Sequence, residues 1–446
     1  MTFERIAEIA LIETSVPERA LDMAATLLID TIGVAAGAAQ LDVARIARDH
    51  AVAFHGAGSP EQAASLMFDG RQASIPGAAF AAATQIDNLD AHDGLNATKG
   101  HIGCAVVPAL FAFAEKKPEL SARDALTALV MSYEIAARAA TALHASVSDY
   151  HTSGAWNGLG VAALGCRLRG ASAEQLRQAL GIAEYHGPRS QMMREIANPT
   201  MLHDGSGMGA LVGCMATFLA MDGFTGAPAI TVEDAPEHWS DLGEVWTIEQ
   251  NYIKPYPICR WAHAALDAVS ALMSEHGFAG TDVAKVEVST FAESAALFPG
   301  LPQTTSQAQY SLAFAVAALL THGKIGPDQI TDAGLRDPAV AAVLHCISVR
   351  EEPRHSARFP EGRWSDVTVT LKDGRQVASG DVNARGGPEG PLALHEIEAK
   401  FHTIAAAVPP GRRSALWDIR ARLLQPGATF EELASLVRPA IGASDV

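Results

Sequence analysis

Apolar residues recur at helical spacing through the first two thirds of the chain. After Pro17, the residues Leu21, Ala24, Leu28 and Ile32 are three or four positions apart, as on one face of a helix. Many other positions hold alanine or glycine, which is typical of closely packed helices. We predict helices within residues 1–40 on both sides of Pro17, an irregular segment at 187–204, and further helices over 41–56, 72–88, 104–116, 121–145, 154–170, 172–184 and 205–222.

The pattern changes after about residue 270. Val286 and Val288 alternate with polar neighbours, which predicts a strand over 283–291. An Asp-Gly pair at 373–374 between two β-type runs predicts a hairpin over 367–378. Helical patterns occur at 311–320 and return at 392–408, 413–423 and 429–438. The predicted fold is therefore mainly α: a large all-helical domain formed by both chain ends, residues 1–268 and 393–446, and an inserted smaller α+β domain, residues 269–392.

The composition narrows the class of protein. The chain has 446 residues, of which 19% are charged, and its formal net charge of −17 argues against nucleic acid as a partner. The N-terminus does not resemble a signal peptide and no run of about 20 apolar residues occurs, so we expect a cytoplasmic protein with no membrane partner. The five cysteines are widely spaced without a CxxC pair, which favours reduced thiols over iron–sulfur or structural zinc sites.

The segment at 87–104 concentrates three carboxylates, two histidines and a lysine directly before an apolar helix. Asp87 and Asp90 are three positions apart and would share one helix face. Two glycines would let the backbone approach a ligand closely. His101 would lie near a helix N-terminus, where an anion is favoured. These groups predict acid–base chemistry on a small acidic substrate; the alternative is a polar loop with a capped helix.

A second candidate stretch begins at Lys254, which the following prolines hold in extended backbone. A helix starting near Cys259 would bring Arg260, His263 and Asp267 onto adjoining faces. An inward-facing lysine near apolar walls has a lowered pKa and can act as a base. The alternative is a surface lysine in a proline-rich turn.

Other polar residues have both a functional and a structural interpretation. His151 could donate to a substrate carboxylate, or it could be a core histidine bonded to backbone. Arg189 could clamp a carboxylate through a bidentate pair, or it could be solvated. The GxGxxA run at 205–210 weakly resembles a dinucleotide fingerprint, but no hydrophobic strand precedes it. The pairs His144 with His151 and His92 with His101 could bind a metal, but neither has a standard ligand spacing, so we predict no metal.

In their order along the chain, several motifs resemble those of the MmgE/PrpD family, and the resemblance covers nearly the whole length. Each motif is weak alone, whereas the ordered set is specific. The matching landmarks are Leu28-Ile-Asp30-Thr31-Ile-Gly33, Asp87-x-x-Asp90-x-His92-Asp93 followed by His101, Tyr150-His151-Thr152, Ala179-Leu-Gly-Ile-Ala183, Lys254-Pro-Tyr-Pro-x-Cys-Arg260-x-x-His263, Ala308-Gln-Tyr310-Ser311-Leu, Pro391-Leu392 and Lys400-Phe401.

The resemblance implies an all-helical domain built from both chain ends, a smaller α+β domain, an active site between them, and usually a homodimer. Members of the family include 2-methylcitrate dehydratase, cis-aconitate decarboxylase and iminodisuccinate epimerase. They act on small di- or tricarboxylates without a metal or organic cofactor. The site positions of the family fall here on Asp87, His101, His151 and Lys254, with Tyr310 as a further position.

Two positions depart from the family pattern. Ala91 stands where decarboxylase-like members have threonine beside the aspartates. Residues 201–203, Met-Leu-His, stand where dehydratases and decarboxylases carry a lysine, and no lysine occurs between Lys117 and Lys254. One cationic group of the family site is therefore missing or replaced by His203, which disfavours lyase chemistry.

The retained groups suit the removal and return of a proton next to a carboxylate, with positive or hydrogen-bonding groups stabilising the enolate. We predict a cofactor-independent epimerase of a small dicarboxylate, for which iminodisuccinate is the family's example. The alternatives are a 2-methylcitrate dehydratase-type lyase and a non-catalytic carboxylate-binding protein. Lys254 and His101 are the predicted opposed acid–base groups, with Asp87 orienting His101. The predicted substrate-binding residues are His151, Arg260, His203, Asp90 and Tyr310.

Overall fold

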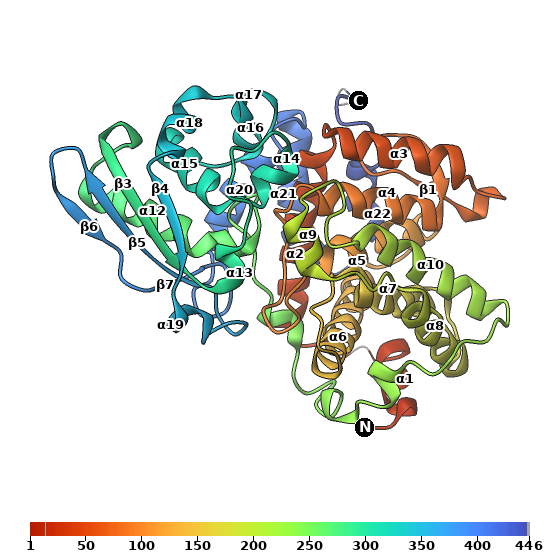
Figure 1. The fold of residues 1–446 in the computed structure, drawn as a ribbon. Helices are drawn as coiled ribbons and strands as arrows, with labels where there is room; N and C mark the ends of the chain where they lie inside the picture. The colour runs from red at the N-terminus through yellow and green to blue at the C-terminus, as the bar shows by residue number, and fades with distance from the viewer. Residues whose placement is uncertain (14, 444–446) are drawn as a thin grey trace. The chain divides into compact units, whose positions relative to one another are not determined.

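The computed structural model describes residues 1–13 and 15–443, which form two compact units. The first unit comprises Met1–Met192, His203–Asn251 and Leu394–Val446, and the second comprises Met193–Leu202 and Tyr252–Ala393. The predicted fold class is confirmed, since the chain is mainly helical and its larger sheet lies in the inserted part (Figure 1).

The first unit is a set of helices packed through small residues. A Cβ on Gly213 of α10 would lie 2.5 Å from the Gly158 carbonyl oxygen of α7, so these two helices approach at backbone distance. The Gly/Ala-rich sequence thus permits the close packing that it predicted. The helices are α1 (Phe3–Leu11), α2 (Glu18–Ala38), α3 (Asp42–Phe54), α4 (Ile75–Asp87), α5 (Gly103–Ala114), α6 (Ala122–Ser146), α7 (Gly154–Arg169), α8 (Ala173–His186), α10 (Ser206–Met221), α11 (Ile230–Glu233), α20 (Leu394–Ile404), α21 (Pro410–Leu423) and α22 (Phe430–Val437).

Helix α2 is the one described helix that is long and apolar enough to cross a membrane by length and composition. In the structure, however, 83% of its most apolar window is buried inside the protein. Asp30 in the middle of α2 pairs with Lys400 of α20 at 2.7 Å. A buried core helix explains this composition without a membrane.

The second unit is built on a five-stranded sheet with strand order β4-β3-β5-β6, in which β7 also pairs with β5. Strand β3 (Val283–Thr290) is parallel to β4 (Ile347–Glu351) and antiparallel to β5 (Trp364–Leu371). The predicted hairpin joins β5 to β6 (Gln376–Ala378), and Gly374 in its turn has φ +89°. The other elements are β7 (Val382–Asn383), α12 (His263–His276), α13 (Ala292–Ala295), α14 (Thr305–Gln309), α15 (Leu312–His322), α16 (Pro327–Ile330), α17 (Asp332–Leu335), α18 (Pro338–Leu344) and α19 (Pro353–Ser356).

Several local elements differ from the sequence prediction, among them one helix start, one strand and one helix. The helix predicted at 72–88 begins at Ile75, because β2 (Gln72–Ser74) precedes it and pairs with β1 (Ala63–Ser65). Strand β4 was not predicted, since its pairing with β3 is set by contacts between distant residues. Helix α9 (Met192–Ala197) lies inside the segment predicted as irregular.

Candidate functional site

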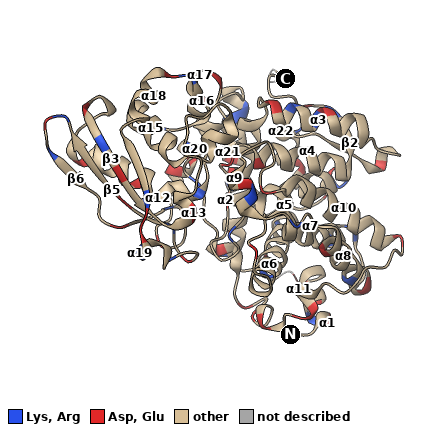
Figure 2. Cartoon of the chain, in the orientation of Figure 1, with Lys and Arg blue, Asp and Glu red and all other residues tan. Residues whose placement is uncertain are grey.

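Most of the helical ribbon carries no charged residue (Figure 2), since only 19% of the residues are charged. The first unit nevertheless encloses a cluster of carboxylates and imidazoles from the end of α4, the loop before α5, and the loop before α10. All of its members are at most 7% exposed. We call this set the acid–histidine cluster; it consists of Asp87, Asp90, His92, Asp93, His101 and Asp204.

His101 is held at both ring nitrogens. Its Nδ1 lies 2.7 Å from the backbone carbonyl of Asp93, so Nδ1 must carry a hydrogen, because a carbonyl only accepts. The Nε2 atom lies 3.7 Å from the Asp204 carboxylate. In the neutral ring Nε2 therefore has a lone pair and can accept a proton, and Asp204 would stabilise the imidazolium that forms.

Asp204 is itself fixed by the start of α7. Its Oδ1 accepts hydrogen bonds from the hydroxyl of Ser153 at 2.6 Å and from the Ser153 N–H at 3.1 Å. The same hydroxyl accepts a 2.9 Å bond from the backbone N–H of His101. Ser153 thus joins His101 to Asp204 across 52 and 51 residues of sequence. Sequence reasoning missed both roles, because neither residue has a spacing that marks it.

Gly100 and Gly103 were predicted to let the backbone approach a ligand closely. In the structure, the backbone at both glycines lies close to protein side chains. A Cβ on Gly100 would lie 2.5 Å from the Ser153 hydroxyl oxygen. A Cβ on Gly103 would overlap the carboxylate of Asp93. A larger residue at either position would displace the groups that orient His101.

Asp87 faces a different histidine. One of its oxygens accepts the N–H of Ser206 at 3.1 Å, and the other lies 3.4 Å from Nε2 of His92. Burial, and then the nearby Asp204 and Asp90, raise the pKa of Asp87 well above its ordinary value. The structure thus places Asp204 beside His101 Nε2 and Asp87 beside His92, and the orienting role of Asp87 on His101 stays a prediction.

Asp90 and Asp93 complete the acidic part of the cluster. Asp90 has φ +55°, a left-handed conformation that short polar residues tolerate better than most side chains. Burial raises the pKa of Asp93 to about 6, although the neighbouring His92 opposes this effect. Carboxylates with raised pKa values in a buried cluster are typical of functional sites.

A buried lysine anchors the loop that carries this cluster. Nζ of Lys400 donates to both oxygens of Asp30 at 2.7 Å and to the backbone carbonyl of Ala91 at 2.7 Å. The Lys400-Phe401 landmark therefore has a structural role, since it fixes the backbone between Asp90 and His92 from 309 residues away.

His151 belongs to a neighbouring segment of the first unit. Its Nδ1 bonds the carbonyl of Asp149 at 2.9 Å, and its backbone forms a bridge with Gln191. The preceding Tyr150 donates its hydroxyl to the carbonyl of Lys99, so this segment supports the turn that leads to His101. His203 is 3% exposed and directly precedes Asp204.

In the second unit, Lys254 is fully buried, with a relative exposure of 0%. The preceding residue, Ile253, donates its N–H to the carbonyl of Gly386 at 3.0 Å, which ties the lysine segment to the 384–386 loop. The burial of Lys254 agrees with the predicted inward orientation and excludes the alternative of a surface lysine.

Arg260 holds the same loop. Its guanidinium donates to the carbonyls of Arg385 at 2.6 Å and Ala384 at 2.8 Å, and it lies 4.2 Å from the ring centroid of Tyr252. Burial lowers the pKa of Arg260 to about 10. These contacts give Arg260 a structural role in positioning the loop beside Lys254, and its predicted role in substrate binding stays a prediction.

Tyr310, the remaining predicted residue, is 1% exposed and donates its hydroxyl to the carboxylate of Glu195 on α9. This bond connects α9 to the turn before α15, within the second unit. The structure therefore gathers Asp87, Asp90 and His101 in the first unit and ties the Lys254 and Tyr310 segments into the second.

Comparison with known proteins agrees with the motifs. The family model for the MmgE/PrpD N-terminal domain matches residues 7–235, and the model for the MmgE/PrpD C-terminal domain matches residues 256–424. A cis-aconitate decarboxylase of Homo sapiens is 24% identical over 379 residues, which cover 80% of this chain and 76% of the relative. A cis-aconitate decarboxylase-like protein of Aspergillus oryzae is 24% identical over 432 residues, which cover 85% of each chain.

Proposed function

The chain belongs to the MmgE/PrpD family, and from this premise we propose that it is an epimerase of a small dicarboxylate. The reaction would remove the proton from the carbon next to a carboxylate and return it to the opposite face. The observation that carries the proposal is the environment of His101, which presents Nε2 as a proton acceptor beside a buried carboxylate.

In the proposed mechanism, Nε2 of His101 accepts the α-proton and the electrons of the C–H bond form an enolate. Asp204 stabilises the resulting imidazolium, because it lies 3.7 Å from Nε2. We assign the opposed acid–base role to Lys254, whose complete burial suits a group that must exchange protons with substrate rather than with bulk water. Return of a proton to the opposite face then inverts the centre without expelling any group.

The residue set favours epimerisation over elimination. A lyase must also expel hydroxide or carbon dioxide, which needs further cationic or acidic groups. The segment at 201–203 has His203 where lyases of the family carry a lysine, and no lysine lies between Lys117 and Lys254. Epimerisation of an iminodisuccinate-like substrate needs only the removal and return of a proton at a carbon that bears a carboxylate, which fits the groups retained here.

A lyase acting on a tricarboxylate is the second candidate, because the two relatives named above carry decarboxylase names. This candidate includes the decarboxylase and the 2-methylcitrate dehydratase types of reaction. A carboxylate-binding protein without catalysis is the third. We also propose a cytoplasmic homodimer, for which light scattering of the purified protein is the direct check of the oligomeric state.

The deciding experiment incubates the protein in deuterated water with iminodisuccinate, cis-aconitate and 2-methylcitrate in separate reactions. With iminodisuccinate we expect deuterium uptake, detected by NMR, and inversion of configuration, detected by chiral chromatography, with no change in alkene absorbance. Carbon dioxide release or a new alkene would support the lyase instead. Binding of a compound that is never turned over, with Lys254→Ala changing only its affinity, would support the binding protein.

A further inference from the structure

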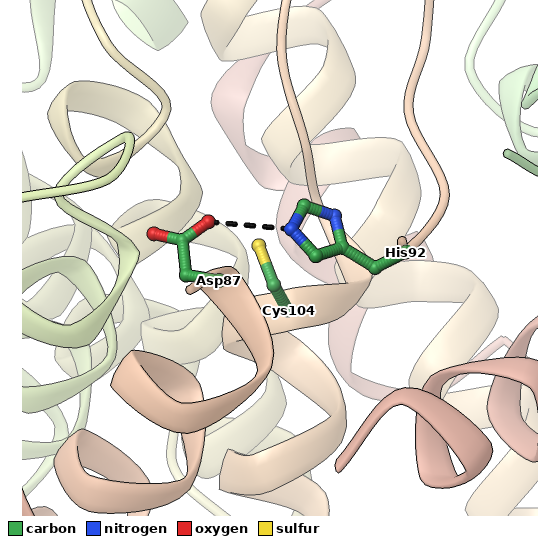
Figure 3. Close-up of side chains that lie close together, drawn as sticks. All are labelled: Asp87, His92 and Cys104. Carbon is green, nitrogen blue, oxygen red and sulfur yellow. Dashed lines mark ion pairs between the residues drawn. The ribbon is translucent and has the colours of Figure 1, made fainter. Parts of the chain in front are cut away.

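A second histidine–carboxylate pair lies beside the proposed proton acceptor, at the end of α4 (Figure 3). Nε2 of His92 faces an oxygen of Asp87 at 3.4 Å. The ring of His92 meets the ring of His101 edge to face, with the two centroids 4.5 Å apart. His92 is fully buried, so it can influence a reaction only through its neighbours.

One backbone carbonyl fixes the hydrogen positions of both imidazoles. Nδ1 of His101 lies 2.7 Å from the carbonyl oxygen of Asp93, and Nδ1 of His92 lies 3.2 Å from the same oxygen. A carbonyl oxygen has two lone pairs and can only accept, so both Nδ1 atoms carry a hydrogen. In the neutral rings the lone pair is therefore at Nε2, which faces Asp204 in His101 and Asp87 in His92.

On its other side, Asp87 receives hydrogen bonds from uncharged groups. Sγ of Cys104 donates to the hydroxyl oxygen of Ser206 at 3.2 Å, and Nδ2 of Asn157 donates to the same oxygen at 3.2 Å. These two bonds use both lone pairs of that oxygen, so the Ser206 hydroxyl donates its own hydrogen to Asp87, as the Ser206 N–H does at 3.1 Å. Burial raises the pKa of Cys104 well above its ordinary value, so the donor at the start of this chain is a thiol.

The charges around the pair favour the acid form of Asp87. The titratable groups that face the pair are Asp30, Asp90, Asp93, His101, Cys104 and Asp204. Most of them are carboxyl groups, and a further buried carboxylate would add to their negative charge. Burial, and then repulsion from Asp204 and Asp90, accordingly raise the pKa of Asp87, although the hydrogen bonds from Ser206 oppose this effect.

The separation of the two side chains agrees with an uncharged pair. An imidazolium and a carboxylate in contact form a charge-assisted hydrogen bond of about 2.7–2.9 Å. The buried His355 of the second unit has this spacing, because its Nε2 lies 2.9 Å from Asp366, which Arg354 also contacts. The longer 3.4 Å between Nε2 of His92 and Asp87 fits a contact without opposite charges.

We propose that Asp87 and His92 form an uncharged pair that positions His101, with the hydrogen of the Asp87 carboxylic acid directed at Nε2 of His92. The hydrogen bonds then run in one direction, from Cys104 through Ser206, Asp87 and His92 to the carbonyl of Asp93. They end on the carbonyl that sets the tautomer of His101.

This chain gives Asp87 an indirect route to the orienting role that the sequence predicts for it. His92 is the positioning residue, and His101 remains the proton acceptor. When His101 takes up a proton, its imidazolium meets an uncharged ring, whereas a second imidazolium at 4.5 Å would repel it and make His101 a weaker base. The positioning role rests on the proposed function, but the protonation of the pair does not.

The protonation is tested by NMR of the full-length protein labelled with ¹⁵N-histidine, because the nitrogen shifts distinguish the two neutral tautomers from the imidazolium. At neutral pH we expect His92 to be neutral with its hydrogen on Nδ1. The matched control is His355, which should carry a hydrogen on Nε2, since this atom faces the Asp366 carboxylate. The two signals are assigned by their loss in His92→Phe and His355→Gln.

Asp87→Asn is the deciding variant, because the asparagine amide can donate to Nε2 of His92 as the carboxylic acid does. We expect His92 to keep its neutral Nδ1–H form in this variant. An imidazolium at His92 in the wild-type protein that becomes neutral in Asp87→Asn would overturn the proposal. Circular dichroism verifies folding, and if Asp87→Asn does not fold, the form of His92 in the wild-type protein decides.

The positioning role is tested with two replacements of His92. His92→Phe keeps a ring and loses the N–H that bonds the Asp93 carbonyl, so kcat for deuterium exchange should fall about 10- to 100-fold while KM stays within about twofold. The Nδ1–H fraction of His101 should fall with it. His92→Asn provides an N–H near the position of Nδ1 and should recover part of both losses. Wild-type kcat and an unchanged His101 tautomer in both variants would overturn the positioning role.

Protonation and catalysis are measured separately, so their failures are distinguishable. Deuterium exchange by a protein in which His92 is an imidazolium would remove the uncharged pair and keep the epimerase. A neutral Nδ1–H form of His92 in a protein that exchanges no deuterium would keep the pair and remove the epimerase together with the positioning role.

Discussion

Two groups of aspartate and histidine in this protein have similar composition and opposite electrostatics. One is the acid–histidine cluster of the first unit, and the other consists of His355, Asp366 and Asp381 in the second unit. In the second unit, Arg358 and Arg354 hold the pKa of Asp381 below its usual range. In the first unit, burial and neighbouring carboxylates raise the pKa of Asp87 well above its usual range. Residue types alone therefore do not mark a functional site. The first-unit group is held in an environment that disfavours its own charges, which suits proton transfer. The second-unit group is an ion-pair network with Arg354 and Arg358.

The largest expected difference between the two groups concerns catalysis. His101→Gln should lower the rate of deuterium exchange by about 100- to 10,000-fold, because the proposed proton acceptor is lost. His355→Gln is the matched control in the other group and should leave the rate within about twofold, since it removes one member of an ion-pair network. Equal losses of exchange rate in the two variants would contradict the assignment of catalysis to the first-unit group.

The anchor of the first-unit group should matter most for stability. Lys400→Met leaves Asp30 buried without the ammonium group that now contacts both its oxygens, and should lower the free energy of unfolding by about 3–5 kcal/mol. Urea unfolding followed by circular dichroism measures this change. The double variant Lys400→Met/Asp30→Leu should recover much of the loss, and an unchanged midpoint for Lys400→Met would contradict the assignment of an anchor.

The loss in Lys400→Met should also depend on pH. Burial already raises the pKa of Asp30 above its usual value, and Lys400 opposes this effect, so removing Lys400 raises that pKa further. A raised folded-state pKa gives stability that is present below the unfolded value near 3.8 and lost as the pH rises through the folded value. The deficit relative to wild type should therefore grow as the pH rises from acid to neutral, and it should not do so when Asp30→Asn is added.

Arg260 provides a test within the second unit. Arg260→Lys cannot keep both bonds to the carbonyls of Ala384 and Arg385, so it should lower the free energy of unfolding by about 1–3 kcal/mol. If Arg260 chiefly positions the 384–386 loop, Arg260→Lys should lower the free energy of unfolding in urea titrations while the KM for substrate changes little. A large rise in KM with unchanged stability would restore the predicted role in substrate binding.

The smallest effect is expected in the second-unit group. Arg358 and Asp381 are each about one third exposed, so Arg358→Met should cost less than about 1 kcal/mol, and the cost should shrink further in high salt. Denaturant titrations at low and high ionic strength measure it. A cost comparable to that of Lys400→Met would show that this group is more than a screened ion-pair network.

Local chemistry made much of this protein predictable. Ser121 and Ser311 cap helices through their own hydroxyls, and the Asp-Gly turn at 373–374 closes the β5–β6 hairpin, because these features depend on a few neighbouring residues. The period of apolar residues likewise indicated the helices and the inserted α+β part, and the ordered motifs indicated the family.

The tertiary structure alone decided which distant groups meet. Asp204 reaches His101 through Ser153, Lys400 reaches Ala91 across 309 residues, and Cys104 faces Asp87 and His92 only because α4 and α5 pack together. Such contacts follow from the packing of whole helices, and no short pattern in the sequence encodes them. The residues that can do chemistry were therefore visible in the sequence, but their partners were set by the fold.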